Sequence, residues 1–236
     1  MAQSKYLLVL DFDQTIVHSD TYTKVAEMVS PAALQCLKEV LEQQGWPVYM
    51  RNVFAVLKDQ GVSVDEIKAM VQDLPLTDKM LELLVFLREH PNIFDVIILS
   101  DANTCFIEWV LSKHGRSDTV RKVFANPARL ANLTVQLEDY HHQMVCPTCP
   151  VNMCKRIVLK TFLEENRKYT ACVLVGDGVP DLCPALLLSK DDLLLARKGY
   201  PLELAAVTCN NLAAQVVLWT NGQEIVHVLQ RLQLHQ

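Results

Sequence analysis

The sequence predicts an α/β fold in which a doubly wound, mostly parallel sheet carries an inserted all-helical module. Three apolar runs rich in β-formers, at residues 6–10, 94–99 and 171–175, each stop at acidic or small polar residues. Continuous apolar runs of this length are typical of central strands in a parallel sheet that is covered on both faces. Helical patterns separate the runs, and this alternation is expected of a doubly wound sheet.

Two weaker strand candidates extend the predicted sheet, at residues 193–196 and 216–219. Helices are expected between and after the strands, at residues 77–89, 103–113, 152–166 and 222–234. In a sheet of this kind, ligands bind beyond the carboxyl ends of the strands. We therefore expect functional residues in the segments that directly follow the apolar runs.

The interval between the first two strands is too long for a simple crossover. It contains helical patterns at residues 22–29, 32–44, 48–60 and 64–71. The breaks between these helices fall at Pro31, residues 45–47 and Gly61, where proline and glycine interrupt the pattern. We therefore expect a core domain of residues 1–20 and 75–236, with a helical cap of residues 21–74 over the strand ends.

Composition limits the classes of partner. The chain has 236 residues, a formal net charge of -5, and 50% hydrophobic against 21% charged residues, which is a globular composition. Nucleic-acid binding is disfavoured because there is no basic excess to neutralise phosphates. The first apolar stretch is too short for a signal peptide, and no stretch approaches the ~18 apolar residues of a membrane span. We expect a cytoplasmic protein without membrane or nucleic-acid partners.

The eight cysteines are too sparse for a disulfide scaffold and favour a reducing compartment. Five of them stand singly among apolar residues and are interpreted as reduced core thiols: Cys36, Cys105, Cys172, Cys183 and Cys209.

The other three cysteines form a separate group. Cys146 and Cys149 make a CxxC pair, Cys154 follows, and His141 and His142 lie just upstream. Such a group could hold Zn²⁺, but a closed structural site needs a fourth ligand, and no second CxxC supplies one. A redox pair and a purely architectural role are the alternatives.

The first strand is followed by two carboxylates, Asp11 and Asp13, which are one residue apart. They would repel one another unless a cation or a shared proton relieves them. An isolated pair of this kind is more often a turn with a capping aspartate. Ser100 ends the second strand, however, and Asp177 and Asp181 follow the third. The sequence thus predicts several carboxylates and a hydroxyl at one edge of the sheet.

Phosphoryl transfer requires this set of groups together with a cation such as Lys155. A phosphate dianion and an aspartate repel each other, so a hard ion such as Mg²⁺ is needed between them. One aspartate can then attack phosphorus while a second protonates the leaving oxygen. Ser100 and Lys155 can hold the phosphoryl oxygens, and Gly176 and Gly178 let the backbone approach the metal.

These motifs resemble those of a known family. DFDxT, the serine after a hydrophobic strand, the downstream lysine and GDxxxD are similar to the four motifs of haloacid-dehalogenase-type phosphatases. Over nearly the whole chain, the segments DFDQTIV, LPLTDKMLELLVFL, VIILSDANT, CPTCPVNMCK, VGDGVPDLCP and ARKGYP resemble the phosphoethanolamine/phosphocholine phosphatase and pyridoxal-phosphate phosphatase family. The resemblance implies a haloacid-dehalogenase-like fold and phosphatase activity.

The resemblance also implies roles for individual residues. Asp11 would be the nucleophile, Asp13 the general acid and base, and Lys155 the cation that orients Asp11. Mg²⁺ would be held by the Asp11 carboxylate, the Asp13 carbonyl and Asp177, with Asp181 close behind. The residues expected to bind the substrate or support its loop are Thr15, Ser100, Asp20, Asp101 and Gly178.

Two of these residues, Asp20 and Asp101, align with acidic positions that the family links to an amine-bearing head group. A carboxylate facing an ammonium is a sensible specificity device. The alternative for Asp101 is a helix N-cap. The chain departs from the family by a loop about two residues shorter before Asp20 and by Pro180, which suits the first turn of a helix.

We therefore expect a Mg²⁺-dependent phosphomonoesterase that acts through an aspartyl-phosphate on pyridoxal 5′-phosphate, phosphoethanolamine or phosphocholine. Residues 106–111 resemble the pyridoxal-phosphate relative more closely. The cap would exclude water, and Trp46, Tyr49 and Met50 would form its core or contact the leaving group. A receiver-like protein that accepts phosphate on an aspartate, and a pseudoenzyme that binds phosphate esters without turnover, are the alternatives.

Overall fold

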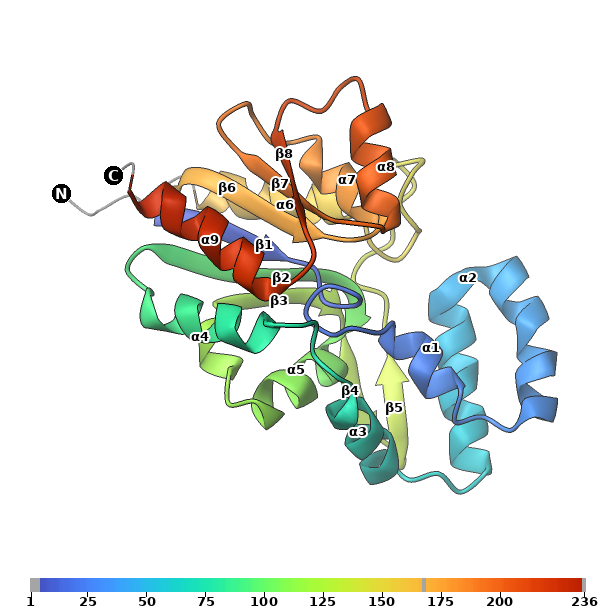
Figure 1. Cartoon of the computed structure of the whole chain (residues 1–236). Helices are drawn as coiled ribbons and strands as arrows, with labels where there is room; N and C mark the ends of the chain where they lie inside the picture. The colour runs from blue at the N-terminus through green and yellow to red at the C-terminus, as the bar shows by residue number, and fades with distance from the viewer. Residues whose placement is uncertain (1–4, 167–168, 235–236) are drawn as a thin grey trace.

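The computed structural model describes residues 5–166 and 169–234. Its strands are β1 (Lys5–Leu10), β2 (Phe94–Asn103), β3 (Lys122–Asn126), β4 (Ala128–Ala131), β5 (Thr134–Leu137), β6 (Tyr169–Gly176), β7 (Leu193–Arg197) and β8 (Gln215–Trp219). Its helices are α1 (Thr21–Ala26), α2 (Pro31–Asp59), α3 (Val64–Asp73), α4 (Met80–Glu89), α5 (Thr104–Lys113), α6 (Lys155–Glu165), α7 (Val179–Ala185), α8 (Pro201–Thr208) and α9 (Gly222–Gln233), with a short 3₁₀ turn at Ser117–Thr119. Figure 1 shows their arrangement.

The main sheet of the described residues has six strands in the order β3-β2-β1-β6-β7-β8. Each of its strand pairs is parallel. From β1 the chain proceeds to β2 and β3 on one side and then returns to place β6 on the other side. Such a reversal of direction opens a crevice at the carboxyl ends of the two central strands. The predicted doubly wound sheet is confirmed.

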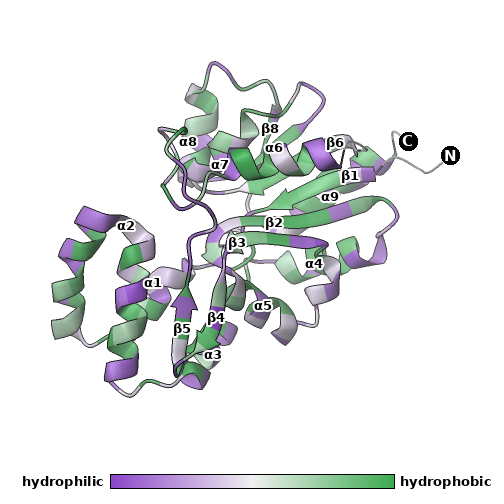
Figure 2. Cartoon of the chain, turned by 180° about the vertical axis from the view of Figure 1, so that it is seen from behind, coloured by the Kyte–Doolittle hydropathy of each residue, from purple (hydrophilic) through white to green (hydrophobic). Residues whose placement is uncertain are grey.

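Alternate residues of β1 face two different layers of helices. Tyr6, Leu8 and Leu10 are buried in a core with α4, α5 and α9, whereas Leu7 and Val9 are buried against α6, α7 and α8. The sheet is therefore the middle of three layers, and its central strands are hydrophobic along most of their length (Figure 2). Burial on both faces explains why these strands read as uninterrupted apolar runs.

The insert between β1 and β2 is helical and lies on the side where the strands end (Figure 1). The break predicted at residues 45–47 divides α2, because Gly45 has φ 75° and ψ 177° and is therefore not helical. Gly45 can adopt this positive φ without a steric penalty because it has no Cβ. Two antiparallel helical arms result. They match the two helices expected on either side of the break.

The connections into and out of the insert run side by side. His18 N–H donates to the Pro75 carbonyl at 2.9 Å, and Thr77 N–H donates to the Ile16 carbonyl at 3.0 Å. An antiparallel bridge between Val17 and Leu76 lies between these bonds. The insert therefore leaves the core and returns to it through one paired crossing.

A β-hairpin from later in the chain packs against the insert. Strands β4 and β5 pair antiparallel, and Thr134 Oγ1 donates to the Phe54 carbonyl of α2 at 3.2 Å. Beyond the hairpin, Arg51 of α2 forms an ion pair of 3.0 Å with Asp139. This hairpin was not predicted, because its strands have only four residues each and alternate too briefly to stand out.

Other differences from the predicted elements concern edges and boundaries. Strand β3 was not predicted because it is a five-residue edge strand that begins at an exposed lysine. Helix α8 was not predicted because its sequence is almost uniformly apolar and lacks a helical period. Helices α4 and α6 begin about three residues later than expected. In the part of the chain that the structure describes, no helix is both long and apolar enough to cross a membrane.

We predict that Gly222→Ala lowers the stability of the protein. Gly222 N–H donates to the Asp78 carbonyl at 2.8 Å at the start of α9, and a Cβ on Gly222 would collide with the Lys79 backbone. Forcing extra atoms into such a contact typically costs about 1–3 kcal/mol. Thermal unfolding should show a clear fall in Tm, whereas exposed Gln230→Ala on the same helix should change it little. An unchanged Tm for Gly222→Ala would contradict this packing.

Candidate active site

The predicted site residues gather at the carboxyl ends of the central strands. Asp11 directly follows β1, and its N–H donates to the Val175 carbonyl of β6 at 3.0 Å, which extends the sheet pairing to the aspartate. Ser100 lies in β2, and Asp177 directly follows β6. Because β2, β1 and β6 are neighbours in the sheet, three residues that are far apart in sequence reach one edge.

Lys155 connects two of the carboxylates. Its Nζ lies 2.9 Å from Asp11 Oδ1 and 2.7 Å from Asp181 Oδ1. All three side chains are buried. Asp11 Oδ1 also accepts the Phe12 N–H at 2.7 Å. Among the described residues these contacts all go to Oδ1 of Asp11, which leaves Oδ2 available for a ligand.

Asp181 is held by the backbone as well as by Lys155. Its Oδ2 accepts the N–H groups of Asp177 at 3.2 Å and Gly178 at 3.1 Å. A Cβ on Gly176 would collide with this carboxylate, so the close approach of α7 to the end of β6 requires glycine there. Both oxygens of Asp181 thus have partners, and its main effect in this geometry is to fix Lys155 and the loop that carries Asp177.

The charges in this cluster do not balance. Three buried carboxylates, those of Asp11, Asp177 and Asp181, have one ammonium between them, and one oxygen from each carboxylate lies within 4.8 Å of the others. Burial, and then the charge of Asp11, raise the pKa of Asp177 to about 8. Burial, and then Asp181, raise the pKa of Asp11 to about 6. Burial lowers the pKa of Lys155, but the charges of Asp11 and then Asp181 outweigh burial, so the pKa of Lys155 is raised.

A hard divalent cation fits this arrangement. The donor atoms are carboxylate oxygens, which Mg²⁺ prefers, and the buried negative charge exceeds the positive charge. A cation beside Asp11 and Asp177 would stabilise their charged forms against both burial and mutual repulsion, the two causes that raise their pKa values. The donor set therefore suits magnesium.

Asp13 lies apart from the lysine and faces the insert. Its Oδ1 accepts the N–H of Thr21 at 3.1 Å, and its Oδ2 accepts the Thr21 hydroxyl at 3.1 Å. Burial, followed by the charges of Asp20 and Asp11, raises the pKa of Asp13 well above its usual range. A raised pKa favours the protonated form, which a general acid needs.

Two hydroxyls complete the floor of the site. Thr15 is fully buried and its Oγ1 donates to Asp177 Oδ1 at 3.3 Å. Ser100 is also fully buried, and its Oγ accepts the Ala102 N–H at 3.3 Å. Because that oxygen acts as an acceptor, its proton remains able to donate to a ligand. Thr15 positions a carboxylate, whereas Ser100 suits an anion.

A cavity of about 600 Å³ opens between the core and the insert. Asp13, Asp20 and Asp101 contribute to its wall, together with Trp46 at the break in α2. The sequence left open whether the aromatic group of the insert is core or contact surface, and the structure divides it. Trp46 is 43% exposed and lines the cavity, whereas Tyr49 and Met50 are buried.

The two acidic residues that were expected to face an amine, Asp20 and Asp101, differ in their local structural roles. The N-cap alternative for Asp101 is wrong, because β2 continues to Asn103 and the Asn103 side chain caps α5 by accepting the Phe106 N–H at 3.0 Å. Asp20 instead caps α1 by accepting the Thr23 N–H at 2.6 Å. Both residues line the cavity. Pro180 lies in the first turn of α7, as expected.

Sequence reasoning missed two residues that order this region. Arg197, at the end of β7, is 4% exposed, donates to the Gln14 carbonyl and contacts His18 Nδ1 at 3.1 Å. It thereby holds the loop after Asp13. The sequence feature that could have identified Arg197 is its position as the one charged residue at the end of an apolar strand. Asn126, at the end of the unpredicted β3, donates to the Asp101 carbonyl at 2.6 Å.

The cysteine group contains a fourth member. Cys183 of α7, which was interpreted as an isolated core thiol, lies with Cys146, Cys149 and Cys154, and the four sulfur atoms are within 4.8 Å of one another. The interpretation of Cys183 as an isolated core thiol is therefore wrong, and the fourth ligand that a second CxxC does not supply is available from α7. The predicted involvement of histidine is not supported for His141, whose Nε2 instead accepts the Cys154 N–H at 2.9 Å.

Comparison with known families gives one match that spans almost the whole chain. The family described as "Putative Phosphatase" matches residues 6–233. The pyridoxal phosphate phosphatase of Bos taurus is 40% identical over 238 residues, covering 96% of this chain and 98% of that protein. The phosphoethanolamine/phosphocholine phosphatase of Gallus gallus is 32% identical over 238 residues, covering 97% of this chain and 89% of that protein.

Solved structures agree on the fold. A substrate-bound phosphoserine phosphatase aligns with a TM-score of 0.63 at 16% identity, covering 96% of this chain and 99% of that chain. A HAD family hydrolase from Salmonella enterica aligns with a TM-score of 0.61 at 14% identity, covering 87% of this chain and 66% of that one. At these identities the likeness concerns the fold alone.

The family match and these relatives, on a haloacid-dehalogenase-like fold, thus define a hydrolase that acts on phosphoric monoesters. The chain belongs to the phosphatase family that matches residues 6–233, together with the pyridoxal phosphate and phosphoethanolamine/phosphocholine phosphatases. The family resemblance inferred from the motifs is confirmed, and the receiver-like and non-catalytic alternatives lose their support.

We predict that Gly176→Ala reduces kcat by about a hundredfold, the typical cost of displacing a catalytic group by about 1 Å. The new methyl group would push Asp181 away from the end of β6 and move Lys155 with it. Steady-state kinetics with a phosphate ester would measure the loss, and Thr170→Ala, at the exposed start of the same strand, serves as the control. A kcat within twofold of the wild type would exclude this role for Gly176.

Proposed function

We propose that the protein is a Mg²⁺-dependent phosphomonoesterase that hydrolyses a small phosphate ester through an aspartyl-phosphate on Asp11. The observation that carries the proposal is the fixed position of the Asp11 carboxylate. Lys155 and the Phe12 N–H hold its Oδ1, so Oδ2 is oriented and free to attack. An oriented nucleophile beside a buried cation is the arrangement that phosphoryl transfer needs.

Asp11, Asp177 and the Asp13 backbone carbonyl would hold the magnesium ion, with Asp181 behind them. Bound there, Mg²⁺ would neutralise the phosphoryl oxygens and so allow an anionic nucleophile to approach an anionic substrate. The Ser100 hydroxyl and the Lys155 ammonium would donate hydrogen bonds to these oxygens. Because these donors are buried and already positioned, they need little reorganisation during the reaction.

In the first step, Asp11 Oδ2 forms a bond to phosphorus while the bond from phosphorus to the leaving oxygen breaks. Asp13, which is protonated, gives its proton to that oxygen, and the alcohol departs. In the second step, Asp13 takes a proton from water as the water oxygen attacks phosphorus. The bond between phosphorus and Asp11 then breaks, inorganic phosphate leaves, and both aspartates return to their initial states.

The residues that line the cavity favour a substrate whose leaving group is cationic or aromatic. Asp20 and Asp101 place negative charge there, which suits the ammonium of phosphoethanolamine or phosphocholine. The exposed ring of Trp46 suits a quaternary ammonium or the ring of pyridoxal 5′-phosphate. The 40% identity to a pyridoxal phosphate phosphatase makes that ester the first substrate to test.

The remaining features of the proposal concern the insert and the location. Residues 21–74 act as the cap of a core formed by residues 1–20 and 75–236, which is supported by the paired crossing at Val17 and Leu76. The position of the cavity between core and insert suits exclusion of water during transfer. The eight free cysteines support a cytoplasmic location.

We predict that phosphate release requires both Asp11 and a divalent cation. Asp11→Asn replaces the attacking oxygen with a poor nucleophile and should lower kcat by at least a thousandfold. Addition of EDTA to the wild-type enzyme should abolish turnover, and Mg²⁺ should restore it. The measurement is release of inorganic phosphate from pyridoxal 5′-phosphate, phosphoethanolamine and phosphocholine.

Asp191→Asn, in an exposed surface turn, is the matched control and should keep wild-type rates. Retention of near-normal kcat by Asp11→Asn would rule out Asp11 as the nucleophile. Full activity in EDTA would rule out the divalent cation.

We predict that Asp20→Asn and Asp101→Asn each lower kcat/KM for amine-bearing esters by on the order of tenfold, which corresponds to about 1.4 kcal/mol. Asparagine removes the charge of Asp20 but remains a good N-cap, so α1 is preserved. Rates with 4-nitrophenyl phosphate, whose leaving group carries no cation, should change much less. The measurement is the ratio of kcat/KM values for the two classes of ester.

The ratio separates charge recognition from a general positioning effect. Equal losses with phosphoethanolamine and 4-nitrophenyl phosphate would show that the two carboxylates do not recognise the amine. Asp20→Ala provides the complementary comparison, because it removes the cap and the charge together.

A further inference from the structure

The segment that leads into Lys155 is unusually long and irregular. Within the described residues, no helix or strand is formed between the end of β5 at Leu137 and the start of α6. Structureless loops longer than about 12–15 residues are uncommon in compact domains. Apolar burial holds this segment near its two ends, where Tyr140 and Met153 pack on the core, but in the middle Met144 and Val145 are 85% and 87% exposed. The middle of the segment therefore depends on other interactions.

One buried amide side chain organises the middle of the loop. Gln143 Nε2 donates to the carbonyls of Cys149 at 3.0 Å and Pro150 at 2.9 Å. Its Oε1 accepts the N–H groups of Val145 at 3.1 Å and Cys146 at 2.8 Å. The backbone is thereby wound around Gln143, and this winding turns the CxxC pair toward the core.

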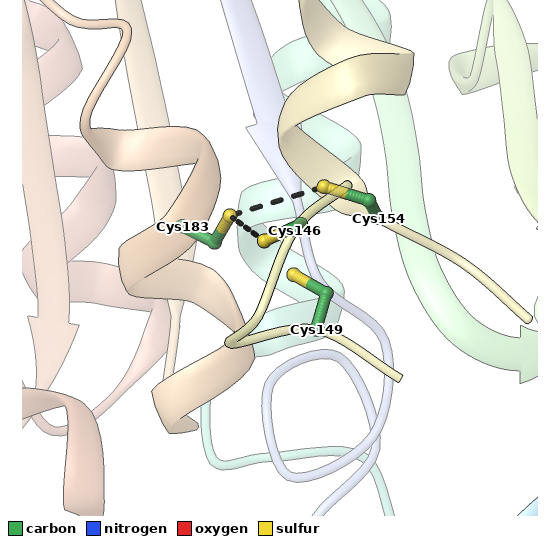
Figure 3. Close-up of side chains that lie close together, drawn as sticks. All are labelled: Cys146, Cys149, Cys154 and Cys183. Carbon is green, nitrogen blue, oxygen red and sulfur yellow. Dashed lines mark hydrogen bonds between the residues drawn. The ribbon is translucent and has the colours of Figure 1, made fainter. Parts of the chain in front are cut away.

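The sulfur atoms brought together by this loop have the spacing of metal ligands. Cys183 Sγ lies 3.6 Å from Cys146 Sγ and 3.9 Å from Cys154 Sγ. Four thiolates around one zinc ion, each at about 2.3 Å, form a tetrahedron with edges of roughly 3.8 Å. Figure 3 shows the four side chains pointing toward a common centre. All four are free cysteines, and together they form a separate small cluster in the interior.

We propose that Cys146, Cys149, Cys154 and Cys183 bind one Zn²⁺ ion in a closed, structural site. Four protein sulfurs fill the tetrahedral coordination of zinc, so no position is left for a substrate or water. A cluster of several irons with bridging sulfides needs more room between the thiolates than a mutual separation within 4.8 Å provides. Soft thiolate ligands also exclude Mg²⁺, which prefers oxygen.

The ion would join two segments that carry charged residues of the active site. Cys154 directly precedes Lys155, and Cys183 lies in α7 with Asp181. Lys155 and Asp181 are themselves in contact at 2.7 Å. The zinc would therefore cross-link the long loop to α7, and it would fix the positions of the two segments that carry Lys155 and Asp181.

Metal analysis tests the proposal directly. The full chain, purified without a histidine tag and in the presence of a reducing agent, should contain about one zinc and essentially no iron per molecule. The zinc content of Cys149→Ser should be at least tenfold lower than that of the wild type. Cys209→Ser, which replaces an equally half-buried cysteine outside the cluster, should keep the zinc content of the wild type. Asp177→Asn should also retain its zinc, which excludes binding at the carboxylates.

A measurement on the wild-type protein covers the case in which Cys149→Ser does not fold. A mercurial thiol reagent should release the zinc as it modifies the cluster, and a cobalt-substituted protein should show the visible absorption bands of tetrahedral Co²⁺ with thiolate ligands. Wild-type protein that contains no zinc, contains iron instead, or holds these cysteines as disulfides would overturn the proposal. Retention of full zinc by folded Cys149→Ser would do the same.

Discussion

The Lys155 ammonium is buried between the carboxylates of Asp11 and Asp181, and much of the surrounding architecture serves to bring these three groups together. Burying a charge is costly unless it is paired and hydrogen-bonded. Here the partners come from the end of β1 and from α7, while the lysine begins α6. The order of the sheet, with β6 beside β1, is what makes this meeting possible. Removing Lys155 would leave two buried carboxylates without their shared cation.

The same cluster explains how an acidic chain can act on an anion. One ammonium does not neutralise three buried carboxylates, and burial first, followed by their mutual repulsion, raises the pKa values of Asp11 and Asp177. A divalent cation and a phosphate dianion carry equal and opposite charges, so their joint arrival leaves the net charge of the site unchanged. The overall charge of -5 is therefore a poor guide to the ligand. The local balance decides what binds.

The sequence predicted those parts of the fold and site that follow from short-range patterns and from the geometry of parallel sheets. Ser100 and Asp177 were found because each follows, directly or by one residue, a strongly apolar run, at residues 94–99 and 171–175. The N-cap alternative for Asp101 failed because β2 continues to Asn103, and a strand end cannot be located to within a few residues from hydrophobicity alone. Cys183 was missed because its partners are far away along the chain, and nothing local distinguishes it from a core thiol.

The contact between Asp13 and Thr21 has a consequence for the proposed cap. Thr21 is the first residue of α1, and its N–H and hydroxyl are the groups that hold the Asp13 carboxyl. The proton donor proposed for the leaving group is therefore oriented by the insert and not by the sheet that carries the nucleophile. A displacement of α1 from the core would release Asp13 while leaving Asp11 in place. In this geometry, the Asp13 carboxyl is correctly oriented only while the insert is docked on the core.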